Sequence, residues 1–374
     1  MIYLDNAATG GFKPRAVTDA AQSVLRFLCA NPGRSGHRLS ITGAKIIEEC
    51  REIIGQTFDA EQDRVIFTKN CTEALNVAIF GSVKKGDHVI TTVYEHNSVL
   101  RPLFRLKEMG IISLDIVAPS IDTDIVEKIK QKICPETRII VTTAVCNVTG
   151  EELPIKAIGQ LAKAHQLIYI VDGAQGGGHV PLSLKDMGIS LLALAGHKGL
   201  YGIMGSGVLL ISNDVDVEPL LYGGTGSESL NLHQPEVYPD KLEAGTLNLP
   251  AISALYHGVR YVQKNITNFA ETLLQTTKNL IANLGTMKNV TCYSQANRSG
   301  IVAFALNNLP SSEVADLLNS DYDIAVRGGL HCAPLIHKHL NTAEEGLVRV
   351  SLAVQNSSRE ISYLLKAVAE LTSR

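Results

Sequence analysis

Three short segments of the chain carry side chains that could together hold a phosphorylated carbonyl compound. Lys198 lies between glycines in the stretch AGHKGLYG, directly after an apolar run, where the backbone leaves room for a ligand. Asp172 ends the apolar run 168–172, and Lys198 follows it by one strand–helix crossover. Thr72 lies at the start of a helical pattern, whose free N–H groups and partial positive charge favour a phosphate.

None of these residues is specific when taken alone. A loop lysine is usually solvated, and an acid after a strand often caps the next helix. A reactive amine, an acid and a phosphate-binding helix end are, however, the groups that pyridoxal 5′-phosphate (PLP) requires for its Schiff base, its ring nitrogen and its phosphate. The combination therefore predicts a PLP site at one edge of a sheet.

The segments that must position these groups alternate between strand and helix patterns from about residue 65 to residue 211. Near-continuous apolar strands of this kind indicate a parallel sheet covered on both faces, so a doubly wound α/β domain is predicted. The predicted strands are 65–68, 88–92, 139–145, 168–172, 191–195 and 207–211. The predicted helices are 72–80, 124–133 and 155–165.

A second domain is indicated after Pro250, where the pattern changes to a long amphipathic helix. Further along, 300–306 and 322–326 read as strands. Ser357 and Glu360 form a capping box at the start of a final helix with one apolar face. No repeat or obvious linker separates the two parts, so the domains are expected to pack closely.

Composition excludes several classes of function. The 374 residues include 34 Lys and Arg against 37 Asp and Glu, no Trp and 5% aromatic residues, so neither nucleic acid nor a membrane is expected as a partner. The seven cysteines form no Cys-x-x-Cys pair, and no leader or membrane-length apolar segment is seen. We expect reduced thiols, a cytosolic location and a small-molecule substrate.

Six motifs, in order, resemble those of the class V aminotransferase family and, within it, the cysteine desulfurases and selenocysteine lyases. They extend through nearly the whole chain, which makes the set far more specific than any one of them. The motifs are YLDNAA at 3–8, EHNS at 95–98, CNVTG at 146–150, VDGAQ at 171–175, GHK at 196–198 and EAGT at 243–246.

This resemblance implies fold type I of the PLP-dependent transferases. Such a fold has a doubly wound, mainly parallel seven-stranded sheet and a smaller α+β carboxyl-terminal domain. We accordingly expect a large PLP-binding domain over 12–255 and a small domain formed by 1–11 and 256–374. Thr246 matches a residue that contacts the phosphate of the neighbouring subunit, which implies a homodimer.

The resemblance also assigns roles around the cofactor. Lys198 is expected to form the Schiff base, Asp172 to hold the ring nitrogen, and His96 to stack on the ring as a catalytic residue. The other cofactor-binding residues implied are Cys71, Thr72, Asn147, Gln175, His197 and Thr246. The substrate-binding residues implied are Asn147, Arg349 and His37.

The segment RGGLHCAP at 327–334 resembles the catalytic cysteine loop of the desulfurases and makes Cys332 the expected nucleophile. The implied reaction converts L-cysteine to L-alanine, with Lys198 removing the α-proton and Cys332 taking the sulfur as a persulfide for an acceptor. His331 is expected to lower the thiol pKa or relay its proton. A metal site at His331, Cys332, His337 and His339 is also conceivable, but its spacing fits no familiar zinc pattern, and no metal is expected.

The chain departs from the family pattern at two positions of the phosphate site. Ala195 replaces a usual serine, and Cys71 replaces a common threonine, so two hydroxyl donors are missing. Thr225, Ser227 or water are the expected replacements.

Two other functions stay open at this point. One is another class V PLP enzyme, such as an aminotransferase, selenocysteine lyase or epimerase, in which Cys332 is not catalytic. The other is an inactive sulfur carrier or scaffold on the same fold.

Overall fold

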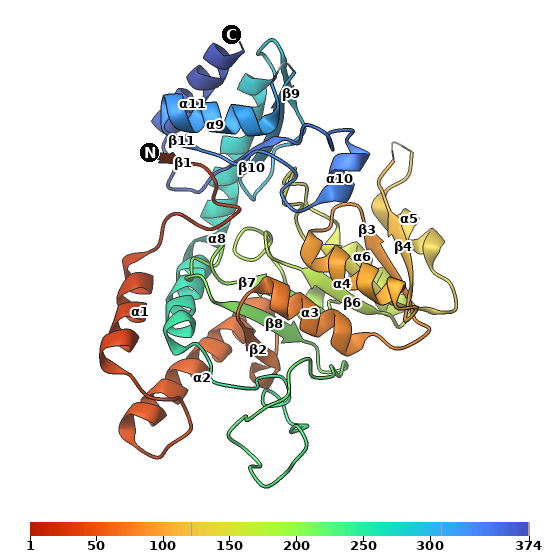
Figure 1. Ribbon diagram of the computed structural model, residues 1–374, viewed down its shortest axis with the longest axis vertical. Coiled ribbons are helices and arrows are strands. Elements are labelled where there is room, and N and C mark those ends of the chain that lie inside the picture. The colour runs from red at the N-terminus through yellow and green to blue at the C-terminus, as the bar shows by residue number, and fades with distance from the viewer. Residues whose placement is uncertain (121, 308, 373–374) are drawn as a thin grey trace.

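A seven-stranded sheet forms the centre of the large part of the molecule in a computed structural model, which describes residues 1–120, 122–307 and 309–372 (Figure 1). The strands lie in the order β2-β8-β7-β6-β5-β3-β4. Strand β8 runs antiparallel to both neighbours, and the other pairs are parallel. The strands are β2 (Val65–Thr68), β3 (His88–Thr92), β4 (Ser113–Val117), β5 (Thr137–Thr143), β6 (Ile168–Asp172), β7 (Leu191–Ala195) and β8 (Gly207–Ile211).

Both faces of this sheet are covered by helices. One face packs against α3 and α4, and the other packs against α2, α5, α6, α7 and α8. These helices and their companions are α1 (Arg15–Phe27), α2 (Arg38–Phe58), the 3₁₀ turn η1 (Gln62–Arg64), α3 (Cys71–Ser82), α4 (Asn97–Glu108), α5 (Ile125–Lys132), α6 (Ile155–Ala164), α7 (Leu184–Met187) and α8 (Leu249–Leu284).

Alternation along the strands builds the two core layers. In β2, Ile66 joins the layer of α3, while Val65 and Phe67 join the opposite layer of α2. All five residues of β7 are buried, as expected for a central strand covered on both sides. The apolar strands recognised in the sequence therefore fix which loops meet at each edge of the sheet.

Helix α8 joins the large part to the carboxyl-terminal part. It has 36 residues, which gives a length of about 54 Å. Its first turns pack on α1 and α2, and its last turns pack on β9, β10 and α11 (Figure 1). The domain boundary expected at residue 255 falls inside this continuous helix.

The carboxyl-terminal part contains two small sheets. One is antiparallel with the order β12-β10-β9, and the other pairs β1 in parallel with β11. Its elements are β1 (Ile2–Tyr3), β9 (Val290–Cys292), β10 (Ile301–Leu306), α9 (Ser311–Tyr322), β11 (Ile324–Ala325), α10 (Pro334–His339), β12 (Val348–Ser351) and α11 (Ser358–Leu371). Leu4 packs in the same core as Phe304 and Leu364, so the start of the chain belongs to this part.

Most of the predicted elements are confirmed, including the seven-stranded, mainly parallel sheet and the capping box of Ser357 and Glu360. The prediction missed β4, an edge strand whose first four residues are not buried. Strand β5 starts and ends two residues before the predicted range 139–145. The predicted strand 322–326 shortens to β11 because α9 runs to Tyr322 and ends at Asp323 with φ 54°. Among the described helices, none has the length and apolar character that a membrane span requires.

Candidate active site

A cleft lies at the carboxyl edge of the large sheet, where ligands bind in folds of this type. Asp172 is the last residue of β6, and Lys198 follows the end of β7 by three residues. The cleft is lined by Asn70, Cys71, Thr72, Leu75, His96, Ser98, Thr143, Asn147, Asp172, Ala174, Gln175, Ala195, His197 and Lys198. The structure thus brings together Lys198, Asp172, Thr72 and five further residues that the sequence assigned to the site, namely Cys71, His96, Asn147, Gln175 and His197.

Asp172 is held at the base of the cleft. Its Oδ1 accepts a hydrogen bond from the Ala174 N–H at 2.9 Å and faces the Cys71 Sγ at 3.5 Å. Burial and the nearby carboxylate of Asp172 raise the pKa of Cys71, so this cysteine stays a thiol and donates. At the position where a threonine was the more common residue, Cys71 therefore supports the carboxylate instead of offering a hydroxyl to a phosphate.

Lys198 carries an amine whose pKa is lowered by burial, although Cys71 and Asp172 act in the opposite direction. A lowered pKa favours the neutral amine, which is the form that attacks a carbonyl carbon. The peptide that precedes it is fixed by hydrogen bonds from the Gly10 N–H and Lys13 Nζ, both 3.0 Å from the His197 carbonyl oxygen.

The amino end of α3 lines one end of the cleft, where its free N–H groups could bind an anion. Asn70 caps this 12-residue helix, and Thr72 lies in its first turn. The Thr72 and Ser98 hydroxyls are 2.8 Å apart. Ser98 was not predicted to compensate for the hydroxyls missing at Cys71 and Ala195, yet it lines the cleft.

His96 and His197 are both neutral at ordinary pH. Burial lowers the pKa of each to about 4. His96 caps α4, and its Nδ1 accepts a hydrogen bond from the Ser98 N–H at 3.1 Å. His197 Nδ1 lies 3.1 Å from the Thr9 hydroxyl. A neutral imidazole at position 96 has the flat, uncharged face that stacking on an aromatic ring requires.

Arg349 is 1% exposed and lies between two fixed acceptors. Its Nη2 donates to Asp5 Oδ1 and its Nη1 donates to the Asn147 carbonyl oxygen, both at 2.9 Å. Its Nε is buried without a hydrogen-bond partner. Burial lowers the pKa of this guanidinium, and Asp5 raises it.

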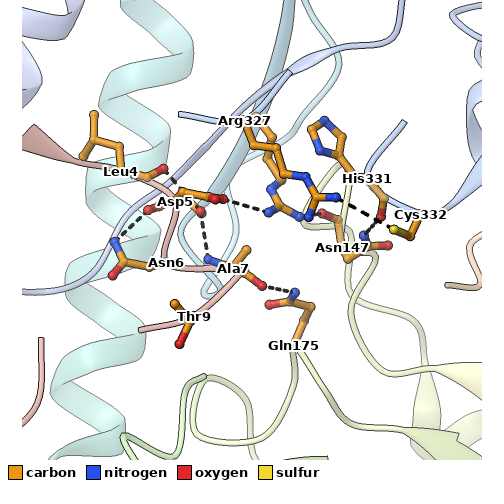
Figure 2. Close-up of polar contacts among 12 residues, drawn as sticks. Leu4, Asp5, Asn6, Ala7, Thr9, Asn147, Gln175, Arg327, His331 and Cys332 are labelled. Atoms are coloured by element: carbon orange, nitrogen blue, oxygen red, sulfur yellow. Dashed lines mark hydrogen bonds and ion pairs between the residues drawn. The ribbon is translucent and has the colours of Figure 1, made fainter. Parts of the chain in front are cut away.

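Gln175 and Asn147 also face this region (Figure 2). Gln175 Nε2 donates to the Ala7 carbonyl oxygen at 2.9 Å, and Asn147 Nδ2 donates to the His331 carbonyl oxygen at 2.7 Å. Asn147 Oδ1 is buried and has no partner. One acceptor of Asn147 in the cleft therefore stays available to a ligand.

Cys332 is exposed on a tight turn next to the cleft. His331 and Cys332 have φ values of 49° and 58°, a left-handed conformation that costs energy in residues other than glycine. The turn is held where the Asn97 N–H donates to the Cys332 carbonyl oxygen at 2.7 Å and where Asn147 donates to His331. Asn97 begins α4 and Asn147 lies in the loop after β5, so the large part of the molecule anchors the turn and holds its thiol in place.

The polar neighbour of the Cys332 sulfur is Arg327, not His331. Arg327 Nη2 lies 3.8 Å from Sγ, whereas the His331 ring points away and its Nε2 donates to the Leu347 carbonyl oxygen at 2.9 Å (Figure 2). Burial lowers the pKa of His331 to about 2, so this ring is neutral. The geometry does not match the expected role of His331, and the group beside the sulfur is the guanidinium of Arg327.

Four predicted site residues do not line the cleft: Arg349 and Cys332, described above, and His37 and Thr246. His37 is exposed and caps α2 through its contact with the Ser40 N–H at 3.3 Å. Thr246 is exposed, and its hydroxyl accepts a hydrogen bond from Asn31 Nδ2 at 3.3 Å. Thr225 and Ser227 lie 3.1 Å from each other and do not line the cleft either. The roles expected of these residues stay predictions.

A metal site is the other interpretation that the sequence offers for the histidines near Cys332. The rings of His331 and His337 are 5.9 Å apart, and within residues 1–120, 122–307 and 309–372 no three His, Cys, Asp or Glu side chains gather around one point.

Sequence reasoning missed the contribution of Asp5, Ser98 and Arg327. Each residue lies within a motif named in the sequence analysis, but the residue that its side chain contacts was not predicted. Asp5 and its partner Arg349 are 344 positions apart, so no local spacing signals the pair.

The residues of the cleft fit a PLP cofactor. An amine at Lys198, an acid at Asp172 and hydroxyls at a helix start are the donor set that such a group needs. The unpartnered Oδ1 of Asn147 agrees with a ligand in the cleft.

The fold and the cleft define the chain as an α/β enzyme with its ligand site at the carboxyl edge of the main sheet. The chain belongs to the class-V aminotransferase family, whose sequence profile matches residues 2–364. A probable cysteine desulfurase of Methanothermobacter thermautotrophicus is 32% identical, over 99% of this chain and 94% of the relative.

Two solved structures have the same fold. The apo cysteine desulfurase of Thermococcus onnurineus superposes with a TM-score of 0.93 at 31% identity, covering 100% of this chain and 94% of that chain. The cysteine desulfurase CsdA of Escherichia coli, in an S-sulfonic acid form, gives 0.90 at 26% identity, covering 99% and 94%.

Proposed function

We propose that this chain is a PLP-dependent cysteine desulfurase that converts L-cysteine to L-alanine and keeps the sulfur on Cys332 as a persulfide. The observation that carries the proposal is the placement of an exposed thiol on a rigid turn tied to Asn97 and Asn147. Asn147 lines the cleft, and Asn97 follows His96, which also lines it. The named relatives agree with this assignment.

PLP, when bound, would stabilise negative charge at the α-carbon of the substrate, and Lys198 would hold it covalently. Asp172 would hold the ring nitrogen, and the start of α3 with Thr72, Ser98 and His197 would hold the phosphate. His96 presents its neutral ring, and Gln175 presents its side chain to the same cleft.

The other steps of the proposed reaction are carried out by three side chains of the protein. Arg349 offers its unpaired Nε to the substrate carboxylate, and Lys198 as a neutral amine takes the α-proton. The Cys332 thiolate, next to Arg327, attacks the substrate sulfur. The S–S bond forms as the substrate C–S bond breaks, and the electron pair of that bond stays with the three-carbon fragment. That fragment takes up a proton at its β-carbon and regains one at its α-carbon from Lys198, and it then leaves as alanine.

A spectrum combined with product analysis tests the proposal. Purified protein should show a visible cofactor band and form alanine from L-cysteine in the presence of a reducing thiol. Lys198→Ala should lose the band, whereas Cys332→Ala should keep the band and lose alanine formation. Cys29→Ala is the matched control, because Cys29 is also exposed but lies at the end of α1.

Two experimental results would contradict the desulfurase proposal and favour one of the other functions. Activity on other amino acids with undiminished turnover in Cys332→Ala would indicate another class V enzyme, such as an aminotransferase, selenocysteine lyase or epimerase. A protein without a band or turnover would indicate a sulfur carrier or scaffold.

We further propose a homodimer in which Thr246 contacts the partner's phosphate site, and a sulfur-acceptor protein that meets Cys332. Both residues are exposed, as such roles require. Seven free cysteines suit a reducing compartment such as the cytoplasm. Sedimentation of wild-type protein measures the dimer, and a Thr246→Ala variant should bind the cofactor more weakly.

A further inference from the structure

Residues 5–13, which we call the N-terminal strap, contact three groups that the site uses. Asp5 accepts from Arg349, Ala7 accepts from Gln175, and Gly10 donates to the carbonyl of His197. None of these contacts follows from the chemistry assigned above. They show that one short segment runs along the substrate-binding and cofactor-binding residues (Figure 2).

The position of Asp5 is fixed by the strand that carries Arg349. The Ser351 N–H donates to the Leu4 carbonyl oxygen at 2.7 Å, and the Ala7 N–H donates to the Ser351 hydroxyl at 2.9 Å. Asp5 itself forms a parallel bridge with Ser351. Because Ser351 follows Arg349 by two residues in β12, the carboxylate and the guanidinium are placed by one hydrogen-bonded backbone.

The hydrogen bonds to Asp5 and Asn147 occupy the two terminal nitrogens of Arg349 and leave its Nε free. Asp5 and the Asn147 carbonyl each hold one terminal nitrogen at 2.9 Å, so the plane of the guanidinium cannot rotate without breaking a buried bond. The unpaired Nε is left as a buried donor, which is unfavourable until a ligand accepts its hydrogen.

We propose that Asp5 is the positioning residue that orients Arg349 for the carboxylate of the substrate. This inference rests on the proposed desulfurase function. The opposite role, in which Asp5 occupies the place of the substrate carboxylate and must leave, conflicts with its fixed backbone on both sides. It also leaves the unpaired Nε without a purpose.

The test compares Asp5→Ala and Asp5→Asn with wild-type protein in the full chain loaded with PLP. We expect the KM for L-cysteine to rise on the order of 10- to 100-fold in Asp5→Ala, with a smaller change in kcat. Asp5→Asn keeps an acceptor oxygen without the charge and should give an intermediate KM. Asp19→Ala removes an exposed aspartate paired with Arg15 and serves as the matched control.

Binding of two ligands without turnover provides the second measurement. L-alanine carries a carboxylate, and ethylamine is the same molecule without it. Calorimetry should show weaker binding of L-alanine to both Asp5 variants and unchanged binding of ethylamine. A general loss of structure would weaken both ligands, so the difference isolates the carboxylate contact.

The outcomes are distinct. In a folded variant, an unchanged KM or an equally weakened binding of L-alanine and ethylamine would overturn the positioning role. A lower KM would also overturn it, because Asp5 would then compete with the substrate carboxylate for Arg349. If Asp5→Ala does not fold, the isosteric Asp5→Asn decides by the same criteria. Absence of turnover in wild-type protein would instead contradict the proposed function, while the L-alanine comparison would still report on Asp5.

Discussion

Replacement of Glu95 by glutamine should change how stability depends on pH. Glu95 is fully buried beside His96. Its Oε1 accepts from the Thr92 hydroxyl at 2.6 Å and the Thr143 N–H at 3.1 Å, and its Oε2 has no partner. Burial raises its pKa to about 8, and Asp172 adds to the effect. The folded protein therefore holds this carboxyl neutral at pH 7.

The direction of the effect follows from proton binding. Between an ordinary pKa of 4.5 and a folded pKa of about 8, the unfolded chain loses the proton and the folded chain keeps it. Rising pH then favours the unfolded state, by up to about 1.4 kcal/mol per pH unit and about 5 kcal/mol over the whole interval. Below the lower pKa both states are protonated, and this contribution to stability is complete.

Glutamine has the same shape and no proton to lose. We expect Glu95→Gln and wild-type protein to differ little near pH 5, and the variant to be more stable by several kcal/mol near pH 8. Urea unfolding at both pH values measures the difference. Glu52→Gln, on the exposed face of α2, should show no such divergence. Parallel pH curves for Glu95→Gln and wild-type would refute the reasoning.

Three further changes test other parts of the structure. Glu243→Gln breaks a buried ion pair in which Arg51 Nη1 donates to Glu243 Oε1 at 2.9 Å. The variant should lose about 3–5 kcal/mol of the free energy of unfolding. A loss below about 1 kcal/mol would argue against a strong buried pair. Gly346→Ala should slow alanine formation while the cofactor band is retained. The φ of Gly346 is +66°, and a Cβ there would lie 2.7 Å from the backbone of Gly329, beside the cysteine loop. An unchanged rate of alanine formation would contradict this. Burial lowers the pKa of His331 to about 2, so below about pH 6.5 the unfolded chain gains a proton that the folded chain does not, and stability falls by up to about 1.4 kcal/mol per pH unit. In His331→Gln the melting temperature should therefore depend less on pH across that range. Equal acid sensitivity of the two proteins would exclude this residue as the cause.

The sheet and its edge could be predicted because strands buried on both faces leave an unmistakable apolar pattern. The end of β6 at Asp172 and the end of β7 near Lys198 follow directly from that pattern. Strand β4 could not be found in the same way, because an edge strand pairs on one side only and keeps polar residues such as Asp115. The seven strands were expected only from the resemblance to the family.

Side-chain partners were harder to predict than positions. His331 stands next to Cys332 in the sequence, but two successive left-handed residues turn its ring toward Leu347 and bring Arg327 to the sulfur. The role of Asp5 depends on a contact with a residue at the other end of the chain, which no sequence spacing reports. The role proposed for Thr246 depends on a partner chain, so contacts within one chain do not test it.

The pairing of β1 with β11 has a consequence for biosynthesis. Ile2 lies opposite Ile324, so its partner leaves the ribosome only after 322 further residues have been added. At roughly 5–20 residues per second this delay lasts about 15–65 s. During this time the nascent segment has no strand to join, and the carboxyl-terminal core closes as a late step of folding. Peptide tags or fusions placed before Ile2 should therefore affect the yield of folded enzyme more than additions elsewhere on the surface.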